Sequence, residues 1–238
     1  MACWFTDVWE ELERSTELKE AGHVNFYQIC NTMVKPWTRN TGNSIALLMN
    51  SEEPLKAEVM VSHAWGESVR ETLVAVLAKA SVSGINLSTP IWFCTFAQYQ
   101  AGDMDGDCGP SVKEQLALNP FKRVIDSKPF YGMLVIHTST AELYSRLWCV
   151  FEINESIAAQ VHPISAYSMA ALQQLQRNEQ SGLDLVKALE VDTSKATCWS
   201  SEDAAMIRGK IEAAGGFERL DGVIKYFRSA SVRVFCDM

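Results

Sequence analysis

The chain has 238 residues, of which 47% are hydrophobic and 21% charged, a composition typical of a globular protein with a sizeable core. Its net charge of −8 and the absence of Lys/Arg clusters argue against nucleic acid as a partner. No apolar run reaches the roughly 18 residues that a membrane span requires, so we expect no membrane partner and a cytoplasmic protein.

The cysteines and histidines indicate neither a disulfide framework nor a metal site. The seven cysteines are an odd number without C-x-x-C spacing, which predicts reduced thiols. The four histidines lie far apart in the sequence, and no two of them share a helix turn. We therefore expect no bound metal.

Residues 1–54 predict an N-terminal helical extension. Residues 1–20 have the pattern of a short amphipathic helix. The main apolar segments that follow are Val24 to Val34 and Ser44 to Met49, and Pro36 is expected to break the helix between them.

Residues 55–238 predict an α/β domain, because short apolar strands alternate with helical patterns. The expected strands are Ala57 to His63, Pro90 to Phe96 and Gly132 to His137, with helices at Glu67 to Lys79 and Ser111 to Asp126. This alternation predicts a flavodoxin-like parallel sheet with helices on both faces.

The C-terminal third predicts further helices that complete this domain. Pro163 to Ala166 is a strand candidate. The remaining expected elements are helices near Met169 to Gln176, Ser201 to Ala214 and Phe217 to Phe227, and a β-prone run from Ser231 to Phe235.

Candidate ligand-binding residues follow from the sheet topology. In an open parallel sheet, ligands bind outside the carboxyl ends of the strands. This rule selects residues 62–65 after the first strand, residues 96–107 after the second and residues 137–140 after the third.

The most informative stretch is Tyr144 to Glu152, which places a carboxylate four residues after Trp148 in an otherwise apolar helix. Ser139-x-x-Glu142 is a capping-box signature for the start of that helix. On a helical wheel Glu152 points away from the main apolar stripe, where it could be an ordinary solvated side chain.

The neighbours of Glu152 favour burial instead. Trp148 and Cys149 flank Glu152 on the wheel, and Tyr144 and Phe151 widen the apolar arc. A helix that is apolar on most of its circumference is buried. A buried carboxylate must be paired or held in a polar pocket, and its pKa is then perturbed, as is common at functional sites.

Each of the other candidates has a structural interpretation beside the functional one. Ser62 and His63 could contact a ribose or phosphate, or they could be a helix N-cap and a satisfied turn histidine. Trp65 could stack on a nucleobase or close the core. Ser139 is at least a capping residue. Cys149 is interpreted as a buried structural thiol, because nothing nearby in sequence would lower its pKa.

The segment Asp103 to Glu114 imitates the oxygen ligands of an EF-hand calcium loop. It has Cys108 where that loop requires glycine, so a solvated acidic loop is the better interpretation. A further possibility is that this loop forms a lid over Glu152, which its two glycines, Gly106 and Gly109, would permit.

Three features in this order resemble a TIR domain: a strand that ends at His63, a strand that leads to Ser139, and the stretch Tyr144 to Glu152. The last is close to the Y-x-x-S-x-W-C-x-x-E-L pattern of plant TIR domains and satisfies the W-x-x-x-E pattern of bacterial ones. The chain is also similar to uncharacterised protist proteins that pair S-H-x-W with R-x-W-C-x-x-E. The resemblance covers roughly residues 55–165.

The resemblance implies a flavodoxin-like sheet, self-association and, in the catalytic branch, cleavage of the nicotinamide N-glycosidic bond of NAD. NAD is then the substrate, and no cofactor is implied. The glutamate that matches Glu152 contacts the nicotinamide ribose. The expected binding residues are Ser62, His63 and Trp65 in the turn after the first strand, with Ser139 and Trp148.

The sequence also departs from the TIR pattern. A long Gly/Asp-rich loop follows the second strand, and Trp65 and Gly66 replace the usual small polar pair. Two alternatives therefore stay open: a non-enzymatic TIR-like interaction module, and a deoxyribosyltransferase-like nucleoside N-glycosidase. An open cleft beside Glu152 would favour an enzyme, and a Glu152 tied to Arg146 or Arg123 would favour the module.

Overall fold

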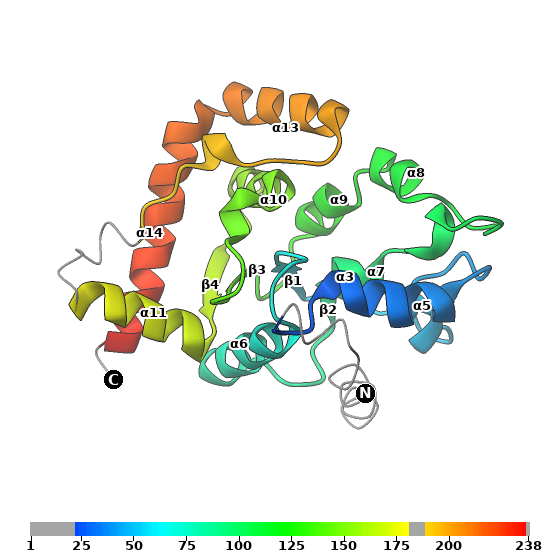
Figure 1. The fold of residues 1–238 in the computed structure, drawn as a ribbon, viewed down its shortest axis with the longest axis horizontal. Helices are drawn as coiled ribbons and strands as arrows, with labels where there is room; N and C mark the ends of the chain where they lie inside the picture. The colour runs from blue at the N-terminus through cyan, green and yellow to red at the C-terminus, as the bar shows by residue number, and fades with distance from the viewer. Residues whose placement is uncertain (1–21, 181–188, 237–238) are drawn as a thin grey trace.

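The computed structural model describes residues 22–180 and 189–236, so the helix predicted at residues 1–20 lies outside the described part (Figure 1). Within the described residues the strands are β1 (Val59–Ser62), β2 (Ile91–Phe93), β3 (Met133–His137) and β4 (Pro163–Tyr167). The helical elements before β3 are α3 (Phe26–Ile29), the π turn η1 (Cys30–Val34), α4 (Lys35–Thr38), α5 (Ile45–Met49), α6 (Val69–Val82), α7 (Cys94–Ala97), the 3-10 turn η2 (Ala101–Asp103), α8 (Val112–Ala117) and α9 (Pro120–Asp126). Those after β3 are the 3-10 turn η3 (Leu143–Ser145), α10 (Leu147–Ala158), α11 (Met169–Gln180), the 3-10 turn η4 (Thr193–Lys195), α13 (Ser201–Ala213) and α14 (Gly216–Cys236).

The four strands form one parallel sheet in the order β2-β1-β3-β4. Val61 pairs with Phe93 on one side and with Leu134 on the other, and Leu134 pairs in turn with Ile164. This is the order of the first four strands of a flavodoxin-like sheet. The predicted α/β class with a flavodoxin-like parallel sheet is confirmed.

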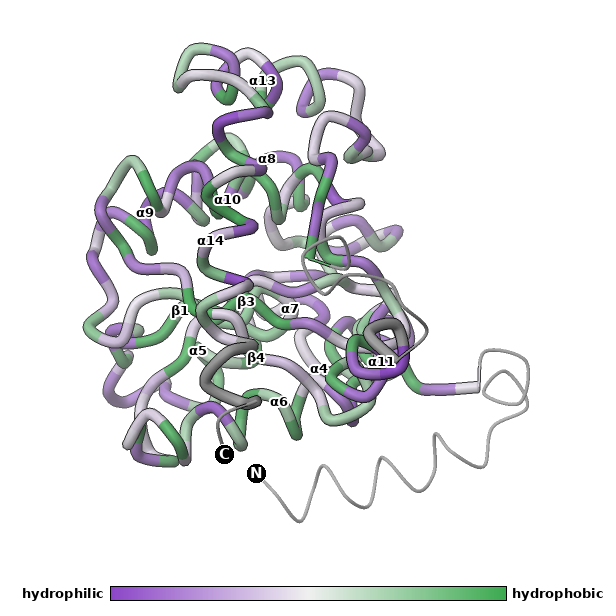
Figure 2. Tube along the Cα trace, turned by 90° about the vertical axis from the view of Figure 1, so that its left-hand side faces the viewer, coloured by the Kyte–Doolittle hydropathy of each residue, from purple (hydrophilic) through white to green (hydrophobic). Residues whose placement is uncertain are grey.

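Successive side chains along β1 and β3 enter two different hydrophobic cores, as the two-residue period of a strand requires. Met60, Met133 and Val135 pack with α9, α10, α13 and α14 on one face. Val61 and Ile136 pack with α3, η1 and α6 on the other. Figure 2 shows hydrophobic stretches at β1 and β3, whereas α11 is mostly hydrophilic. The sheet is therefore buried on both faces, which explains why its strands are continuously apolar.

The segment before β1 is joined directly to the site end of the sheet. The backbone N–H of Phe26 donates to the Trp65 carbonyl over 2.9 Å, and the N–H of Val69 donates to the Val24 carbonyl over 2.9 Å. Phe26 and its neighbours in α3 and η1 belong to the core that also contains β1. Residues 24–34 therefore help to position the turn after β1.

The predicted helix break at Pro36 is wrong, because α3, η1 and α4 form one continuous helical run from Phe26 to Thr38. The π turn at residues 30–34 directly precedes the proline, and the Lys35 N–H donates to the Cys30 carbonyl five residues earlier. This wider turn makes room for the proline ring, which would otherwise clash with the preceding turn.

Three predicted boundaries also need correction. The strand predicted to run to Phe96 ends at Phe93, and Cys94 begins the short helix α7. The helix predicted from Ser111 to Asp126 divides into α8 and α9, because Asn119 adopts a left-handed conformation (φ 51°) before Pro120. The β-prone run at residues 231–235 lies in α14, where the helix that begins at Gly216 continues and overrides local strand propensity.

The predicted capping box at Ser139 is also wrong. The helix that carries Glu152 begins at Leu147, after the 3-10 turn η3. Its start is held by the C-terminal third, because the Leu147 N–H donates to the Thr197 carbonyl over 2.9 Å and the Thr197 N–H donates to the Ser145 carbonyl over 2.9 Å. Arg146 thereby takes an extended conformation immediately before α10.

No helix among residues 22–180 and 189–236 is long and apolar enough to cross a membrane.

Candidate functional site

The structure buries Glu152 on α10 at the carboxyl end of β1, as the apolar residues around it in the sequence predicted. Its side chain is only 5% exposed, and Ser62, the last residue of β1, is fully buried beside it. Both faces of α10 are covered, because it packs against β4 and against α9 and α13. Glu152 is therefore enclosed by protein, although a helical wheel places it away from the main apolar stripe of α10.

Burial is the main influence on the Glu152 carboxyl and raises its pKa to about 7, even though Ser62, His63 and Arg146 each lower it. Neither Ser62 Oγ nor Glu152 Oε2 has a well-aligned hydrogen-bond partner among the described residues. Two buried polar atoms without partners at a strand end are unusual, because buried oxygens are nearly always hydrogen-bonded. The two side chains are close enough to act on each other, because hydrogen bonding by Ser62 is one of the influences that lower the pKa of Glu152.

His63 is held by the protein on all sides. Its Nε2 lies 3.2 Å from Cys94 Sγ, and its Nδ1 lies 3.3 Å from Glu67 Oε1. The ring packs between Phe26 and Phe93, with centroid distances of 4.5 and 4.2 Å. Burial alone would lower the pKa of His63, but the Cys94 sulfur and the Glu67 carboxylate outweigh it and raise the pKa to about 9. This raised pKa favours the protonated imidazole at neutral pH, and the two ring nitrogens face Cys94 and Glu67.

Trp65 and Cys149 complete the inner wall of this cluster. The Trp65 indole N–H donates to Cys94 Sγ over 3.4 Å, and the Trp65 ring lies 5.3 Å from the Tyr27 ring. The Cys149 thiol donates to the His63 carbonyl over 3.3 Å. Burial, followed by the charge of Glu152, raises the pKa of Cys149 well above its usual range. The interpretation of Cys149 as a buried, protonated thiol agrees with this environment.

Two of the expected binding residues lie elsewhere. Ser139 follows β3, where its hydroxyl and its backbone N–H donate to the Glu71 carboxylate over 2.6 and 2.8 Å, and Ser168 donates to the same carboxylate. Trp148 stacks on Phe121 of α9 at 5.2 Å. The structure thus brings together Glu152, Ser62, His63 and Trp65, whereas Ser139 and Trp148 support neighbouring loops and helices.

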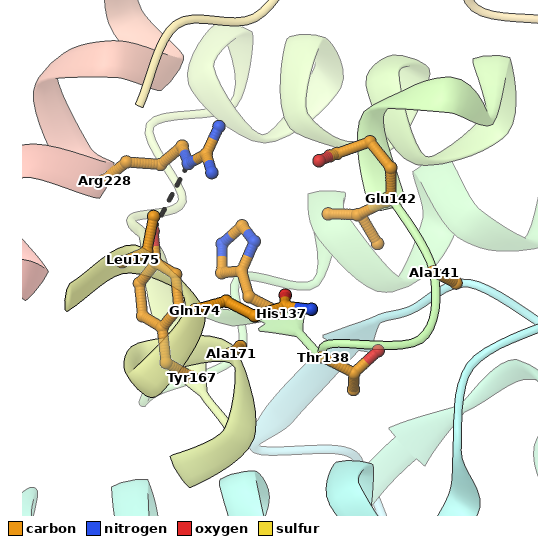
Figure 3. A pocket seen from close by; sticks show the side chains of 10 residues that line it. His137, Thr138, Ala141, Glu142, Tyr167, Ala171, Gln174, Leu175 and Arg228 are labelled. Carbon is orange, nitrogen blue, oxygen red and sulfur yellow. Dashed lines mark hydrogen bonds between the residues drawn. The ribbon is translucent and has the colours of Figure 1, made fainter. Parts of the chain in front are cut away.

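A separate cavity of about 190 Å³ opens at the carboxyl ends of β3 and β4 (Figure 3). His137, Glu142 and Arg228 line it, and Tyr167 accepts a hydrogen bond from Arg228 Nε at 3.3 Å. Burial and then the charge of Arg228 lower the pKa of His137 well below its usual value, so this histidine is neutral. Glu152 is not among the residues that line this cavity.

The acidic loop after β2 is tied to the segment after α4. Asp107 accepts hydrogen bonds from the Tyr99 hydroxyl and the Asn40 backbone N–H, and Arg39 donates to the Asp105 carbonyl. Glu114 caps α8 together with Ser111. The acidic side chains are therefore used within the loop and its anchor. Among the described residues, no group of three or more His, Cys, Asp or Glu side chains could hold a metal ion.

Sequence reasoning missed Cys94, Glu67 and the cavity around Arg228. A signal existed for Glu67, because it is four residues after His63, whereas Cys94 lies inside the second predicted strand and directly follows β2 only in the structure. Arg228 could not be found in this way, because α14 reaches the sheet only through the tertiary fold.

A comparison of the chain with known protein families, with curated proteins and with solved structures finds no match.

Proposed function

We propose that this protein cleaves the nicotinamide N-glycosidic bond of NAD, with Glu152 as the carboxylate that contacts the ribose. The observation that carries the proposal is the buried Glu152 carboxyl beside Ser62 at a strand end, with an oxygen atom that lacks a partner among the described residues. In open α/β sheets, this edge is where ligands bind.

The chemistry suits a single buried carboxylate. When the neutral nicotinamide leaves, the ribose takes on oxocarbenium-like positive charge, and a carboxylate within hydrogen-bond reach of the ribose hydroxyls stabilises that charge. The stabilisation is stronger in a site that excludes water than at the surface. With a pKa of about 7, roughly half of the Glu152 carboxyls are ionised at neutral pH. Capture by water would give ADP-ribose, and capture by the adenine would give a cyclic product.

Several neighbours support this role by their positions. Ser62 is near enough to the carboxyl to lower its pKa, and its hydroxyl would also meet a ribose hydroxyl bound there. His63 positions the turn after β1 rather than touching the ligand, because its two nitrogens already face Cys94 and Glu67. Trp65 is partly exposed and offers a ring face near Tyr27.

The enclosure of Glu152 favours one alternative, the non-enzymatic interaction module. At 5% exposure, the carboxyl can meet a ribose only after local rearrangement of the turn and of the start of α10. Arg146 is also close enough to lower the pKa of Glu152, although the two side chains form no ion pair within 4 Å in the described structure. Arg123 is exposed on α9 and is not part of the cluster.

Nicotinamide release from NAD by the purified wild-type protein tests the proposal. The resemblance to TIR domains implies self-association, so the assay is run over a range of protein concentrations that extends to about 100 μM, within the range where weak association is populated. We expect release of nicotinamide with ADP-ribose or a cyclic product resolved by chromatography. Absence of release at every concentration favours the interaction module, and cleavage of deoxynucleosides instead of NAD favours the deoxyribosyltransferase-like alternative.

A further inference from the structure

The S-H-x-W motif has a partner that its sequence does not reveal, the thiol of Cys94. His63 and Trp65 both direct an N–H group at Cys94 Sγ, from 3.2 and 3.4 Å. The sulfur lies at the start of α7, which follows β2 directly, and β2 pairs with β1. The parallel pairing of these two strands therefore brings the motif and the thiol together.

Glu67 completes a linear arrangement behind the histidine. Its Oε1 lies 3.3 Å from His63 Nδ1 and accepts a hydrogen bond from the Thr72 hydroxyl over 2.8 Å. A thiol, an imidazole and a carboxylate in this order form the arrangement that activates nucleophilic cysteines, because the carboxylate stabilises the imidazolium and the imidazolium stabilises the thiolate.

We propose that Cys94, whose sulfur is contacted by the His63 and Trp65 ring nitrogens, reacts as a nucleophile and is a site of oxidation by hydrogen peroxide to sulfenic acid. Cys94 is only 7% exposed, which is why a reagent as small as hydrogen peroxide is proposed. The proposal does not rest on the NAD activity, because it concerns a different side chain and a different reagent.

The step is balanced without any other reactant. The Cys94 thiolate attacks one oxygen of the peroxide, an S–O bond forms and the O–O bond breaks. The sulfur is oxidised by two electrons, and the peroxide is reduced. The leaving hydroxide takes a proton from the His63 imidazolium and departs as water, so the products are a sulfenic acid, a neutral imidazole and water.

The surroundings of Cys94 differ from those of the two other buried cysteines nearby. Burial raises the pKa of Cys30 to about 11 and that of Cys149 well above its usual range. Only Cys94 of these three has N–H donors directed at its sulfur among the described contacts. The charged and titratable groups that interact with it come from several elements: His63 from the turn after β1, Cys30 from η1, and Arg146 and Cys149 from the start of α10. Glu67 acts on His63.

The molecule therefore contains its own controls. Cys30 and Cys149 are buried to a similar degree but lack the donors, and Cys108 is exposed. An ordinary cysteine is only a few per cent thiolate at pH 7. We expect Cys94 to be oxidised at least about tenfold faster than Cys108 at pH 7, and Cys30 and Cys149 more slowly than Cys108.

Site-resolved mass spectrometry of the intact protein measures these rates. Hydrogen peroxide pulses are quenched with catalase, the protein is unfolded with dimedone to trap sulfenic acid, and each cysteine peptide is quantified. A Cys94 rate no higher than that of Cys108 would overturn the proposal.

Two variants distinguish the effect of the neighbouring N–H groups on the oxidation rate of Cys94 from the effect of burial. Trp65→Phe keeps an aromatic ring and removes the indole N–H, and it is expected to slow Cys94 oxidation about threefold or more. His63→Gln keeps an N–H group and removes the imidazole, so the Cys94 rate is expected to fall at least about tenfold. Each variant is checked for folding by circular dichroism. Unchanged Cys94 oxidation in folded Trp65→Phe, whose ring is only partly buried, would contradict the assignment even where His63→Gln fails to fold.

Discussion

Replacing Glu152 with glutamine is expected to lower kcat/KM for nicotinamide release by about 100- to 1,000-fold while the protein stays folded. The substitution keeps the size of the side chain and its ability to meet Ser62, but it removes the negative charge. Only the charge stabilises the oxocarbenium-like ribose, so the loss falls on the transition state and kcat and kcat/KM decline together.

Glu155→Gln is the matched control for this experiment. Glu155 lies on the same helix, less than one turn further on, where its carboxylate is 3.7 Å from Lys122. We expect this variant to retain nearly full activity. Equal activity of the wild type and of folded Glu152→Gln would show that Glu152 is not the reacting carboxylate, and an equal loss in both variants would indicate a general effect of altering α10.

The same Glu152→Gln variant is expected to gain stability relative to the wild type as the pH rises. The pKa of Glu152 is raised from 4.5 to about 7 in the folded protein, so the folded state binds the proton more tightly than the unfolded state. The wild type is therefore stabilised by this group below the unfolded pKa and loses that contribution as the pH rises through the folded pKa. The whole shift corresponds to roughly 3 kcal/mol.

Glutamine does not titrate, so the difference in the free energy of unfolding between variant and wild type is expected to grow by about 2 kcal/mol between pH 5.5 and pH 8. Urea denaturation at the two pH values measures it, with Glu155→Gln as the reference. A difference that stays constant, or that shrinks with pH, would mean that Glu152 is a structurally paired glutamate.

Loss of activity together with gain of stability is the pattern that a functional buried carboxylate should give. A carboxylate kept for structure would be paired, and its removal would leave a buried partner without a counter-charge, at a cost in stability. Glu152 instead lies in an environment that disfavours its ionised form. Such an arrangement is common at functional sites, where it lowers the stability of the folded protein.

The sequence predicted those elements of the fold whose secondary structure is indicated by a single strong pattern of apolar residues. β1, β3 and α6 were predicted because apolar runs and a helical period are directly visible. The continuation of the helix through Pro36 could not be predicted, because it depends on the π turn at residues 30–34. The residues 231–235 have strand-forming side chains but continue α14, which packs beside β4.

The candidate site was predictable in part for the same reason. The burial of Glu152 followed from its apolar neighbours, and the rule of strand ends placed Ser62, His63 and Trp65 near it. The contact of Ser139 with Glu71 could not be predicted, because Glu71 lies on α6, 68 residues earlier in the chain. The contact of His63 with Cys94 required the pairing of β1 with β2, which the sequence does not specify.

The pH dependence of kcat/KM for nicotinamide release by the wild type tests most directly whether an ionised Glu152 drives the reaction. kcat/KM reports the ionisation of the free enzyme, and the reaction needs the carboxylate, so the rate should follow the deprotonated fraction of a group with a pKa of about 7. We predict a roughly tenfold rise from pH 6 to pH 8 that levels off above neutrality. A rate that is flat or that falls with pH over this range, in protein that remains folded, would contradict the account.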